Sequence, residues 1–511
     1  MASEGPFVYA RRRPELGALH QVVRENLQTL YAAAEAGFAT KLPGFVRDEL
    51  EAYLDCGLLC RGFAWMACTN PECREQRLVA FSCKGRGFCP SCQGREMAQA
   101  AANLVEHVLP AQVPLRQFVL TVPFELRYRL AYDGALLGRV SRIFVDSVLG
   151  FYRRKLQARG VKRGFGGAVT ALQRVSSDLR LNPHFHSIAL DGVFVSSDRG
   201  EPEFHALPHL DTTDVADLMQ VIRVRILRYL VKAGVIDNAC ELTVLEDALA
   251  EREPALAQLA AAAVSGHAPA GPELRQREPV ALRGPVGVQI MGPLSVTAMG
   301  FSLHAATTAR GDDAEGREAL CKYILRPAIA QERLQLLDTG LVRIQLKRPF
   351  RDGTVAIDLD PLSLLCRLAA SVPPPRFHTL KYAGVLASAH KLRPLVVPPP
   401  PAEDASEDAH GHDKPEHPAT HRSRYRPWAE LMKRTFRIDV ETCQCGARMK
   451  LRALLVWAAS IERFLQCLGE PTEPPPLEPA RGPPYFKSRV LRRKHGELDP
   501  HTAAQVELFG A

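Results

Sequence analysis

The sequence predicts a mixed α+β protein in which an antiparallel sheet with helices follows a cysteine-rich N-terminal region. Three observations support this fold class. Short apolar strand-like segments recur from about Val113 onward, segments with helical spacing lie between them, and seven of the thirteen cysteines fall between Cys56 and Cys92. Strands and helices interspersed in one stretch of chain indicate an α+β sheet domain.

Composition narrows the class of protein. The chain has 511 residues, of which 46% are hydrophobic and 24% charged, so we expect several folded domains. The formal net charge of +9 modestly favours a polyanionic partner. The N-terminus has no apolar signal-peptide core, and no apolar run approaches the roughly 18 residues of a membrane span. We therefore expect a cytoplasmic protein with reduced thiols and no membrane partner.

The cysteines are grouped in pairs within "CTNPECREQRLVAFSCKGRGFCPSCQGR". Cys68 and Cys73 form one pair, and Cys89 and Cys92 form a second pair after a further fifteen residues. Two turns that each present two thiolates are typical of a zinc ribbon, so the sequence predicts structural zinc on these four residues. Cys83, between the pairs, is an alternative ligand. The alternative hypothesis is a set of buried free cysteines.

Other residues near the pairs receive different predictions. Cys56 and Cys60 lie in an apparently helical segment, where packed thiols are expected. Lys84, Arg86 and Arg95 surround the second pair, which would suit a ribbon that lies on phosphates. A solvated basic rim is the alternative.

The middle of the chain predicts the sheet domain element by element. "LRQFVLTVPF" (115–124) and "GAVTALQRV" (167–175) indicate strands, and the basic segment 151–164 indicates a helix end and loop. Apolar residues at helical spacing predict a helix over 212–234, with Thr213 as its cap and Gly234 as its end.

The following segments continue this pattern. An Ala- and Glu-rich stretch (237–283) resembles an inserted helical piece, and "REALCKYILRP" predicts a short helix ended by Pro327. "LVRIQLKRPFRDGTVAIDLDP" predicts a hairpin that turns at Asp352 and Gly353. A helix then starts with Asp360 as cap and Pro361 in its first position.

The C-terminal part changes composition. An acidic, proline-rich stretch predicts a disordered linker, whose four histidines (His410, His412, His417 and His421) need no metal. The last part contains "CQCGARMK", with Cys443 and Cys445, and "KSRVLRRKHG"; a lone CxC favours a metal-free turn. The predicted domains are therefore 1–105 (helical and zinc-binding), 106–393 (sheet domain), 394–422 (linker) and 423–511 (basic module).

Two histidines lie one residue apart in "NPHFHSIALDG" (182–192), a segment that otherwise indicates a buried strand. Side chains alternate along a strand, so His184 and His186 face one side and Phe185 the other. Two neutral imidazoles on one face form half of a metal site, whereas a hydrogen-bonded pair at a sheet edge is the alternative. A hard divalent ion held there would polarise a phosphate for attack by water or by a protein nucleophile.

Tyr323 is the candidate nucleophile among eleven tyrosines, because Lys322 and Arg326 flank it in a short helix. A free phenol, with a pKa near 10, attacks poorly at neutral pH, so nearby positive charge or a metal would help. On spacing alone, core packing of Tyr323 against Leu320 and Ile324 is the favoured alternative.

Five motifs in order give a resemblance. The chain resembles rolling-circle transposases of the insertion-sequence-91 family, including the related common-region elements, from about Arg47 to His390, with a weaker likeness through "RTFRIDVETCQCGARMKL". The motifs are "CKGRGFCPSC", "LNPHFHSIALDGVF", "LCKYILRPAIAQERL", "LKRPFRDGT" and "VPPPRFHTLKYAGVLA". The resemblance implies a zinc-binding region followed by an HUH single-strand endonuclease, a ferredoxin-like antiparallel sheet with helices on one side.

The resemblance also implies roles. His184 and His186 would bind a catalytic Mg²⁺ or Mn²⁺, with Gln173 as the candidate third ligand. Tyr323 would form a 5′-phosphotyrosine link and leave a free 3′-OH. Some members use two tyrosines a helical turn apart, but Pro327 occupies the fourth position after Tyr323, as in a single-tyrosine branch. The residues expected to contact DNA are Lys84, Arg86, Arg95, Lys322 and Arg326.

The leading hypothesis is thus a transposase that nicks single-stranded DNA at element ends and transfers strands by a rolling-circle route. Its partners would be that single-stranded DNA and target DNA, with a second copy of the chain as a further candidate, in the nucleoid of a bacterial cytoplasm. A replication initiator would use the same chemistry on other DNA. A zinc-dependent DNA-binding regulator without catalysis and a metal-dependent hydrolase that uses water are the alternatives from other classes.

Overall fold

The computed structural model describes residues 7–38, 40–196, 201–240, 248–266, 282–350, 353–397, 426–483 and 485. The predicted linker from residue 398 onward, with its four histidines, and the basic segment "KSRVLRRKHG" lie outside these residues. Among the helices of the described ranges, none is both long and apolar enough to cross a membrane.

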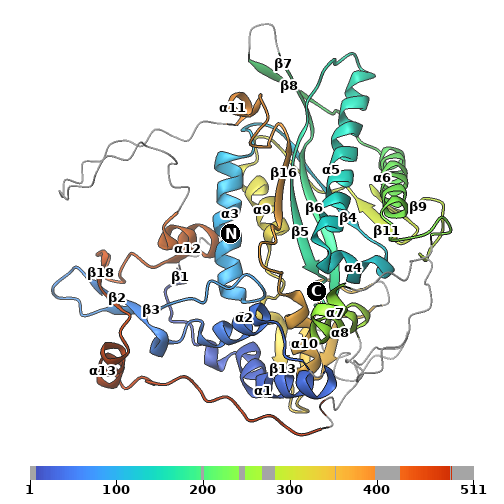
Figure 1. Cartoon of the computed structure of the whole chain (residues 1–511). Helices are drawn as coiled ribbons and strands as arrows, with labels where there is room; N and C mark the ends of the chain where they lie inside the picture. Colours follow the sequence, from blue (N-terminus) through green and yellow to red (C-terminus); the bar gives the residue numbers. More distant parts are fainter. Residues whose placement is uncertain are drawn as a thin grey trace, which may run out of the picture.

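An eight-stranded sheet occupies the centre of the molecule (Figure 1). Its order is β16-β5-β6-β4-β11-β10-β9, with β12 also paired to β4, and every pairing is antiparallel. The strands are β4 (Leu115–Thr121), β5 (Gly167–Val175), β6 (Leu181–Leu190), β9 (Gln289–Gly292), β10 (Ser295–Ala298), β11 (Phe301–His304), β12 (Thr308–Ala309) and β16 (Leu380–Gly384). The predicted strand 167–175 is therefore confirmed, and the mixed α+β class with antiparallel sheets is confirmed.

Helices cover both faces of this sheet (Figure 1). On one face α3 (Pro90–His107) and α9 (Ala314–Leu325) pack with Val169, Ile188 and Leu190. On the other, α5 (Gly134–Gln157) and α6 (Thr212–Lys232) pack with Phe118 and Phe185. The arrangement differs from the one-sided layer that the resemblance implies, because both faces of these strands carry apolar residues that need cover.

The start of α6 differs from the prediction. The carboxylate of Asp211, not the hydroxyl of Thr213, accepts a hydrogen bond at the helix N-terminus, from the Asp214 amide at 2.8 Å. Asp211 has extended backbone angles, as an N-cap residue must, whereas Thr213 is already helical. Gly234 follows the helix with φ +67°, as expected of a residue that ends a helix.

A second core lies beside the sheet and is built from distant parts of the chain. The segment predicted as an insertion contributes α8, which packs against α10 inside this core instead of lying outside it. The carboxylate of Asp360 caps α10 as predicted, by accepting from the Leu362 amide at 2.9 Å. The elements are α1 (Ala18–Phe38), α2 (Gly44–Asp55), α7 (Ala248–Arg252), α8 (Pro254–Ser265), α10 (Pro361–Ser371) and the hairpin sheet β13 (Leu334–Leu336), β14 (Val342–Gln345) and β15 (Ala356–Leu359). Of the predicted turn of this hairpin, Asp352 lies outside the described residues.

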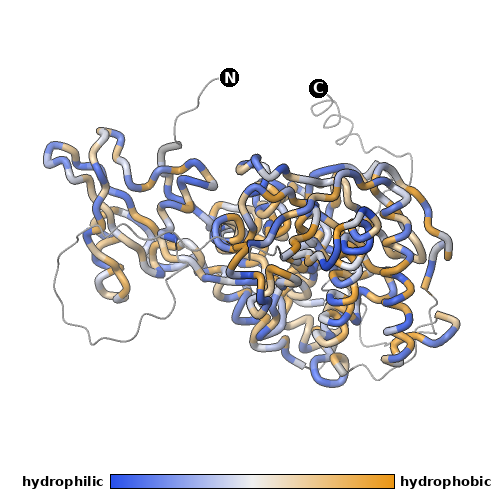
Figure 2. Tube along the Cα trace, turned by 90° about the horizontal axis from the view of Figure 1, so that it is seen from above, coloured by the Kyte–Doolittle hydropathy of each residue, from blue (hydrophilic) through white to orange (hydrophobic). Residues whose placement is uncertain are grey.

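The N-terminal and C-terminal parts of the chain build one small lobe. It extends to the same side of the main body in both views (Figure 1, Figure 2). Its sheet has the order β18-β2-β3, so a strand from the predicted C-terminal module pairs with the N-terminal cysteine region. The elements are β1 (Phe7–Val8), β2 (Phe63–Cys68), β3 (Gln76–Ala80), α12 (Trp428–Phe436), β17 (Ile438–Asp439), β18 (Met449–Leu455) and α13 (Ala458–Leu468).

Candidate metal and tyrosine site

Strand β6 places His184 and His186 on the face of the sheet that α9 covers. The alternation of a strand aims both rings the same way, with centroids 4.9 Å apart. Both are buried, and His186 is only 2% exposed. They lie in the middle of the sheet between β4 and β5. They are therefore not an edge pair.

Each ring is oriented by a hydrogen bond at Nδ1. His184 Nδ1 donates to the Asn182 carbonyl oxygen at 2.7 Å, so its Nε2 keeps a lone pair. His186 Nδ1 lies 2.6 Å from the side-chain amide of Gln117. The amide nitrogen of Gln117 faces the ring. Turning the amide by 180° would place its oxygen there, so that Nδ1 holds the proton and Nε2 presents the lone pair that a metal ion requires.

Burial keeps both rings neutral. Desolvation, followed by the charges of Arg326 and Arg127, lowers the pKa of His184 to about 4. Desolvation, then His184 and Arg326, lowers the pKa of His186 to about 2. A neutral imidazole is the form that binds a metal ion, so at pH 7 neither ring must lose a proton first.

His186 Nε2 is buried and has no hydrogen-bond partner among the residues that the structure describes. A buried polar atom without a partner is costly, and a metal ion would satisfy it. His184 and His186 therefore fit a divalent cation, because such an ion would bind the unpartnered Nε2 of His186.

Tyr323 projects from α9 toward the same place. Its ring lies edge-on to that of His186, with centroids 5.7 Å apart, and the guanidinium of Arg326 lies 4.5 Å from its centre. The side chain is 43% exposed, whereas Leu320 and Ile324 on the same helix are buried. Core packing, the favoured alternative from spacing alone, is therefore not the role of Tyr323.

Gln173 faces the site but is already engaged. It lies opposite His184 in the register of β5 and β6. Its Nε2 donates to the carbonyl oxygens of Ile324 at 3.0 Å and Tyr323 at 3.4 Å. Gln173 thus anchors the end of α9, and its side-chain oxygen is the atom that could bind an ion. Its role as third ligand stays a prediction.

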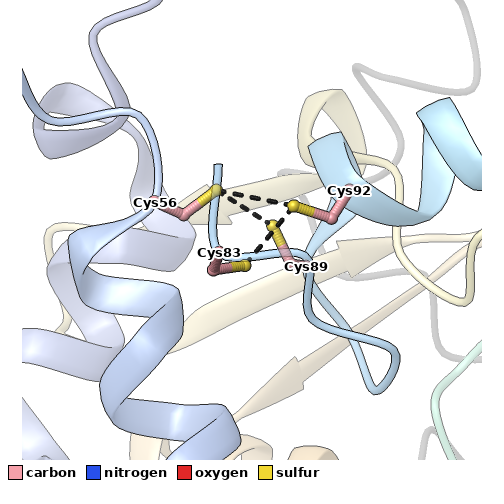
Figure 3. A group of neighbouring side chains, drawn as sticks. All are labelled: Cys56, Cys83, Cys89 and Cys92. Atoms are coloured by element: carbon pink, nitrogen blue, oxygen red, sulfur yellow. Dashed lines mark hydrogen bonds between the residues drawn. The ribbon is translucent and has the colours of Figure 1, made fainter. Parts of the chain in front are cut away.

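The cysteines form two groups of four, and the predicted single site is corrected. The first group is Cys56, Cys83, Cys89 and Cys92 (Figure 3), and the second is Cys68, Cys73, Cys443 and Cys445. Cys68 and Cys73 flank the turn of the β2–β3 hairpin, whereas Cys56 and Cys83 lie at its base. Six residues of strand separate these ends by about 17 Å, too far for one ion to bind both pairs.

The sulfurs of the first group are arranged for a metal. Cys83 and Cys92 are 3.4 Å apart, and Cys89 and Cys56 are 3.5 Å apart. A zinc tetrahedron with Zn–S bonds of about 2.3 Å requires separations of about 3.8 Å, whereas a disulfide needs about 2.05 Å. Hydrogen bonds from Cys83, Cys89 and Cys92 hold the pKa of Cys56 far below its ordinary value, which favours a thiolate.

The structure gives the positions of the cysteines in four predictions. Cys83, the alternative ligand, belongs to the first group, and so does Cys56, which was expected to be a packed thiol. Cys60 does pack, against the cluster of Phe63 and Leu465. The CxC turn, for which a metal-free turn was predicted, contributes Cys443 and Cys445 to the second group. Its signal in the sequence is the CxC followed by Gly446.

The predicted DNA contacts differ in their surroundings. Lys84 and Arg86 are exposed on the loop between Cys83 and Cys89, and Arg95 is half-buried. Lys322 forms an ion pair with Glu318 at 2.8 Å. Arg326 lies over the Tyr323 ring.

The first cysteine group is connected to the tyrosine helix through Gln93, which follows Cys92 in α3. Its Nε2 donates to the carbonyl oxygens of Arg86 at 3.0 Å and Gly87 at 2.6 Å. Its Oε1 accepts from the Ala328 amide at 3.3 Å. The zinc-binding loop and the segment after α9 therefore share one side chain.

Comparisons with protein families gave two matches. Residues 167–393, which contain the histidines and Tyr323, match a family model described as "Putative transposase". Residues 24–122 match the model of the transposase zinc-binding domain of insertion-sequence-91 elements. Comparisons with curated proteins and with solved structures gave no match.

These matches define the class first: the chain is a transposase with a zinc-binding domain. The zinc-binding model is the one of insertion-sequence-91 elements, so the two matches together support an insertion-sequence-91-like transposase, a DNA-processing protein with a zinc-binding domain.

Proposed function

We propose that this transposase nicks single-stranded DNA at the ends of its element by transesterification on Tyr323 and transfers strands by a rolling-circle route. One observation carries the proposal: two buried, neutral histidines and an exposed tyrosine share one face of the sheet, with the Tyr323 and His186 rings 5.7 Å apart. A phosphate between them would meet metal ligands on one side and a nucleophile on the other.

His184 and His186 would hold Mg²⁺ or Mn²⁺ through Nε2, with the Gln173 side-chain oxygen as third ligand. Such an ion, when bound, polarises the scissile phosphate and offsets developing negative charge. Gln117 and the Asn182 carbonyl fix the ring orientations. If the domain is an HUH endonuclease, the central strands of its sheet would form a ferredoxin-like core. Strands β9, β10 and β11 would then extend that sheet beyond β4.

The reaction exchanges one phosphodiester for another. The Tyr323 oxygen forms a bond to phosphorus and gives up its proton to solvent, while the bond to the 3′-oxygen breaks and that oxygen takes a proton. The products are a 5′-phosphotyrosine and a 3′-OH, and no ATP is needed because the number of ester bonds is conserved. Arg326 is placed to offset phosphate charge and to favour the phenolate.

The later strand transfer needs a second nucleophile. Pro327 occupies the fourth position after Tyr323, beyond the last helical residue, Leu325. A second tyrosine one turn further along α9 is therefore absent from this chain. The freed 3′-OH, or Tyr323 of a second copy, would perform that step.

The zinc-binding domain would hold DNA near the site. Lys84 and Arg86 on the metal-binding loop, with Arg95 on α3, would contact phosphates, and Gln93 would keep that loop aligned with α9. These contacts are sequence-independent, so they would position the strand and leave its selection to other groups.

The proposal is tested with labelled single-stranded oligonucleotides from the element's ends, purified protein and Mn²⁺. We expect a denaturation-resistant protein–DNA adduct that is lost in Tyr323→Phe and in His184→Ala/His186→Ala. Tyr229→Phe, on the far side of the sheet in α6, is the matched control and should retain the adduct.

Other outcomes would replace the proposal. Cleavage without an adduct, retained in Tyr323→Phe, would indicate a hydrolase that uses water. Binding without cleavage would indicate a zinc-dependent regulator. Adduct formation on plasmid-origin DNA but not on element ends would indicate a replication initiator.

A further inference from the structure

We propose that Cys68, Cys73, Cys443 and Cys445 form a second zinc centre that clamps the C-terminal segment (426–483) onto the N-terminal lobe and thereby steadies α9. The matched families end at residues 122 and 393, so Cys443 and Cys445 lie outside both. The effect on α9 matters for catalysis only if Tyr323 is the nucleophile, so that part rests on the proposed function.

The geometry is that of a tetrathiolate site. Cys68 and Cys445 sulfurs are 3.5 Å apart, Cys73 and Cys443 sulfurs are 3.6 Å apart, and all four lie within 4.8 Å of one another. These separations are near the roughly 3.8 Å edge of a ZnS₄ tetrahedron and far from the length of a disulfide bond. Four sulfurs without oxygen or nitrogen ligands select zinc over hard cations.

The loops around the sulfurs are shaped for the site. The Asn70 amide donates to Cys68 Sγ at 3.4 Å, as the Gly85 amide does to Cys83 Sγ at 3.3 Å in the first group. In the CxC turn, Gly446 has φ +85° and donates to the Cys443 carbonyl oxygen at 2.9 Å. Both cysteine groups therefore use amide-to-sulfur hydrogen bonds, which stabilise thiolates.

The surrounding apolar contacts are few. The cluster at this end of the lobe has Cys68, Cys443 and Met449 as its buried members, with Met66, Cys73 and Ala447 partly buried against it. Cys445 is exposed. A cluster this small buries little apolar surface, so a metal would supply much of the cohesion here.

A short chain of contacts runs from the CxC turn to α12. The Asp439 carboxylate accepts from the Glu441 and Thr442 amides at 3.0 and 2.9 Å, just before Cys443. Lys433 in α12 lies 3.2 Å from the same carboxylate. Arg77 in β3 donates to the Val440 carbonyl oxygen at 3.1 Å.

Helix α12 then contacts the tyrosine helix. Arg434 Nη2 donates to Glu318 of α9 at 2.7 Å, and its Nη1 donates to Glu106 of α3. Glu318 is in turn paired with Lys322, the residue before Tyr323. Loss of the metal would loosen α12 and remove a charged contact from the helix that carries the nucleophile.

The first test counts metal in the full-length chain. We expect two zinc ions per chain by mass spectrometry of the metal content, one in Cys443→Ser/Cys445→Ser, and two in the control Cys467→Ser, an exposed cysteine outside both groups. Cys445→Ser alone is the milder variant if the double variant misfolds, and cobalt replacement should lose about half of its thiolate-to-metal absorption. Two zinc ions retained in the double variant, or iron in place of zinc, would overturn the proposal.

The second test measures the clamp by amide hydrogen exchange. In Cys443→Ser/Cys445→Ser we expect exchange about tenfold faster or more in α12 and a smaller increase in α9, with α5 unchanged. Loss of one zinc without faster exchange in α12 would overturn the clamp. Both readouts are independent of nicking, so an absence of adduct in the unmodified chain would overturn the proposed function alone.

Discussion

Arg434 in α12 and Glu318 in α9 form a two-pronged charged contact, with Nη2 2.7 Å and Nε 3.1 Å from the same carboxylate oxygen. Their side chains are 28% and 16% exposed, so the pair is partly shielded from water. The residues are separated by 116 positions in sequence. This contact joins the C-terminal segment to the helix of the candidate nucleophile.

A double-mutant cycle with Arg434→Gln and Glu318→Gln should give a coupling free energy of about 1–2 kcal/mol in urea unfolding, because a bidentate, partly buried ion pair is stronger than an exposed one. The matched control is Arg310 with Asp312, whose side chains are 82% and 58% exposed. That pair should couple by no more than about 0.5 kcal/mol. Equal coupling in the two pairs would contradict the assigned role of Arg434.

The same contact should weaken in acid. Burial alone would raise the pKa of Glu106 and of Glu318, but hydrogen bonds from Arg434 and its neighbours outweigh burial and lower both from 4.5. A lowered carboxylate pKa contributes stability above the unfolded value, and this stability is lost as pH falls through the folded value.

The stability difference between the unmodified chain and Arg434→Gln should therefore be constant from pH 8 to about 5 and shrink below about 4.5. Urea unfolding at a series of pH values measures it. A difference that instead grew toward acid pH would show that Arg434 acts through other partners.

Gln117 should affect metal binding only through its hydrogen bond to His186. Gln117→Leu keeps much of the volume but removes the hydrogen bond to Nδ1, which is 2.6 Å long. Loss of such a partner of a metal ligand typically weakens metal binding 10- to 100-fold, so Mn²⁺ affinity should fall by about that factor. Titration calorimetry measures the affinity, with Gln157→Leu at the exposed end of α5 as control. Unchanged affinity would mean that Nε2 of His186 does not bind the ion.

Cys56 and Cys60 provide a matched pair for the first metal group. Cys56→Ser should lower the zinc content by one equivalent, because Cys56 lies 3.5 Å from Cys89 in that group. Cys60→Ser should leave the zinc content unchanged, because Cys60 packs beside Phe63 and Leu465. Metal analysis after dialysis against a weak chelator decides between them. Loss of zinc in both variants would contradict the assignment of Cys56 as a ligand and Cys60 as a packed thiol.

Local patterns predicted much of the sheet domain. The alternation along 182–192 was enough to put His184 and His186 on one face, and the Asp-Pro signal was enough to start α10 at Pro361. The same local rules could not predict that Tyr323 is exposed. The spacing of residues along a helix does not show which side of that helix a neighbouring sheet covers.

Thiolate ligands for zinc, paired histidines on a strand and a mixed α+β fold could be predicted from the sequence, since each depends on residues close together in the chain. The grouping of the cysteines could not be predicted, because it depends on how distant strands pair. The length of the β2–β3 hairpin separates Cys68 and Cys73 from Cys89 and Cys92. The pairing of β18 with β2 instead brings Cys443 and Cys445 to Cys68 and Cys73. A metal site selects ligands by distance in space, and strand pairing between the two ends of the chain sets that distance.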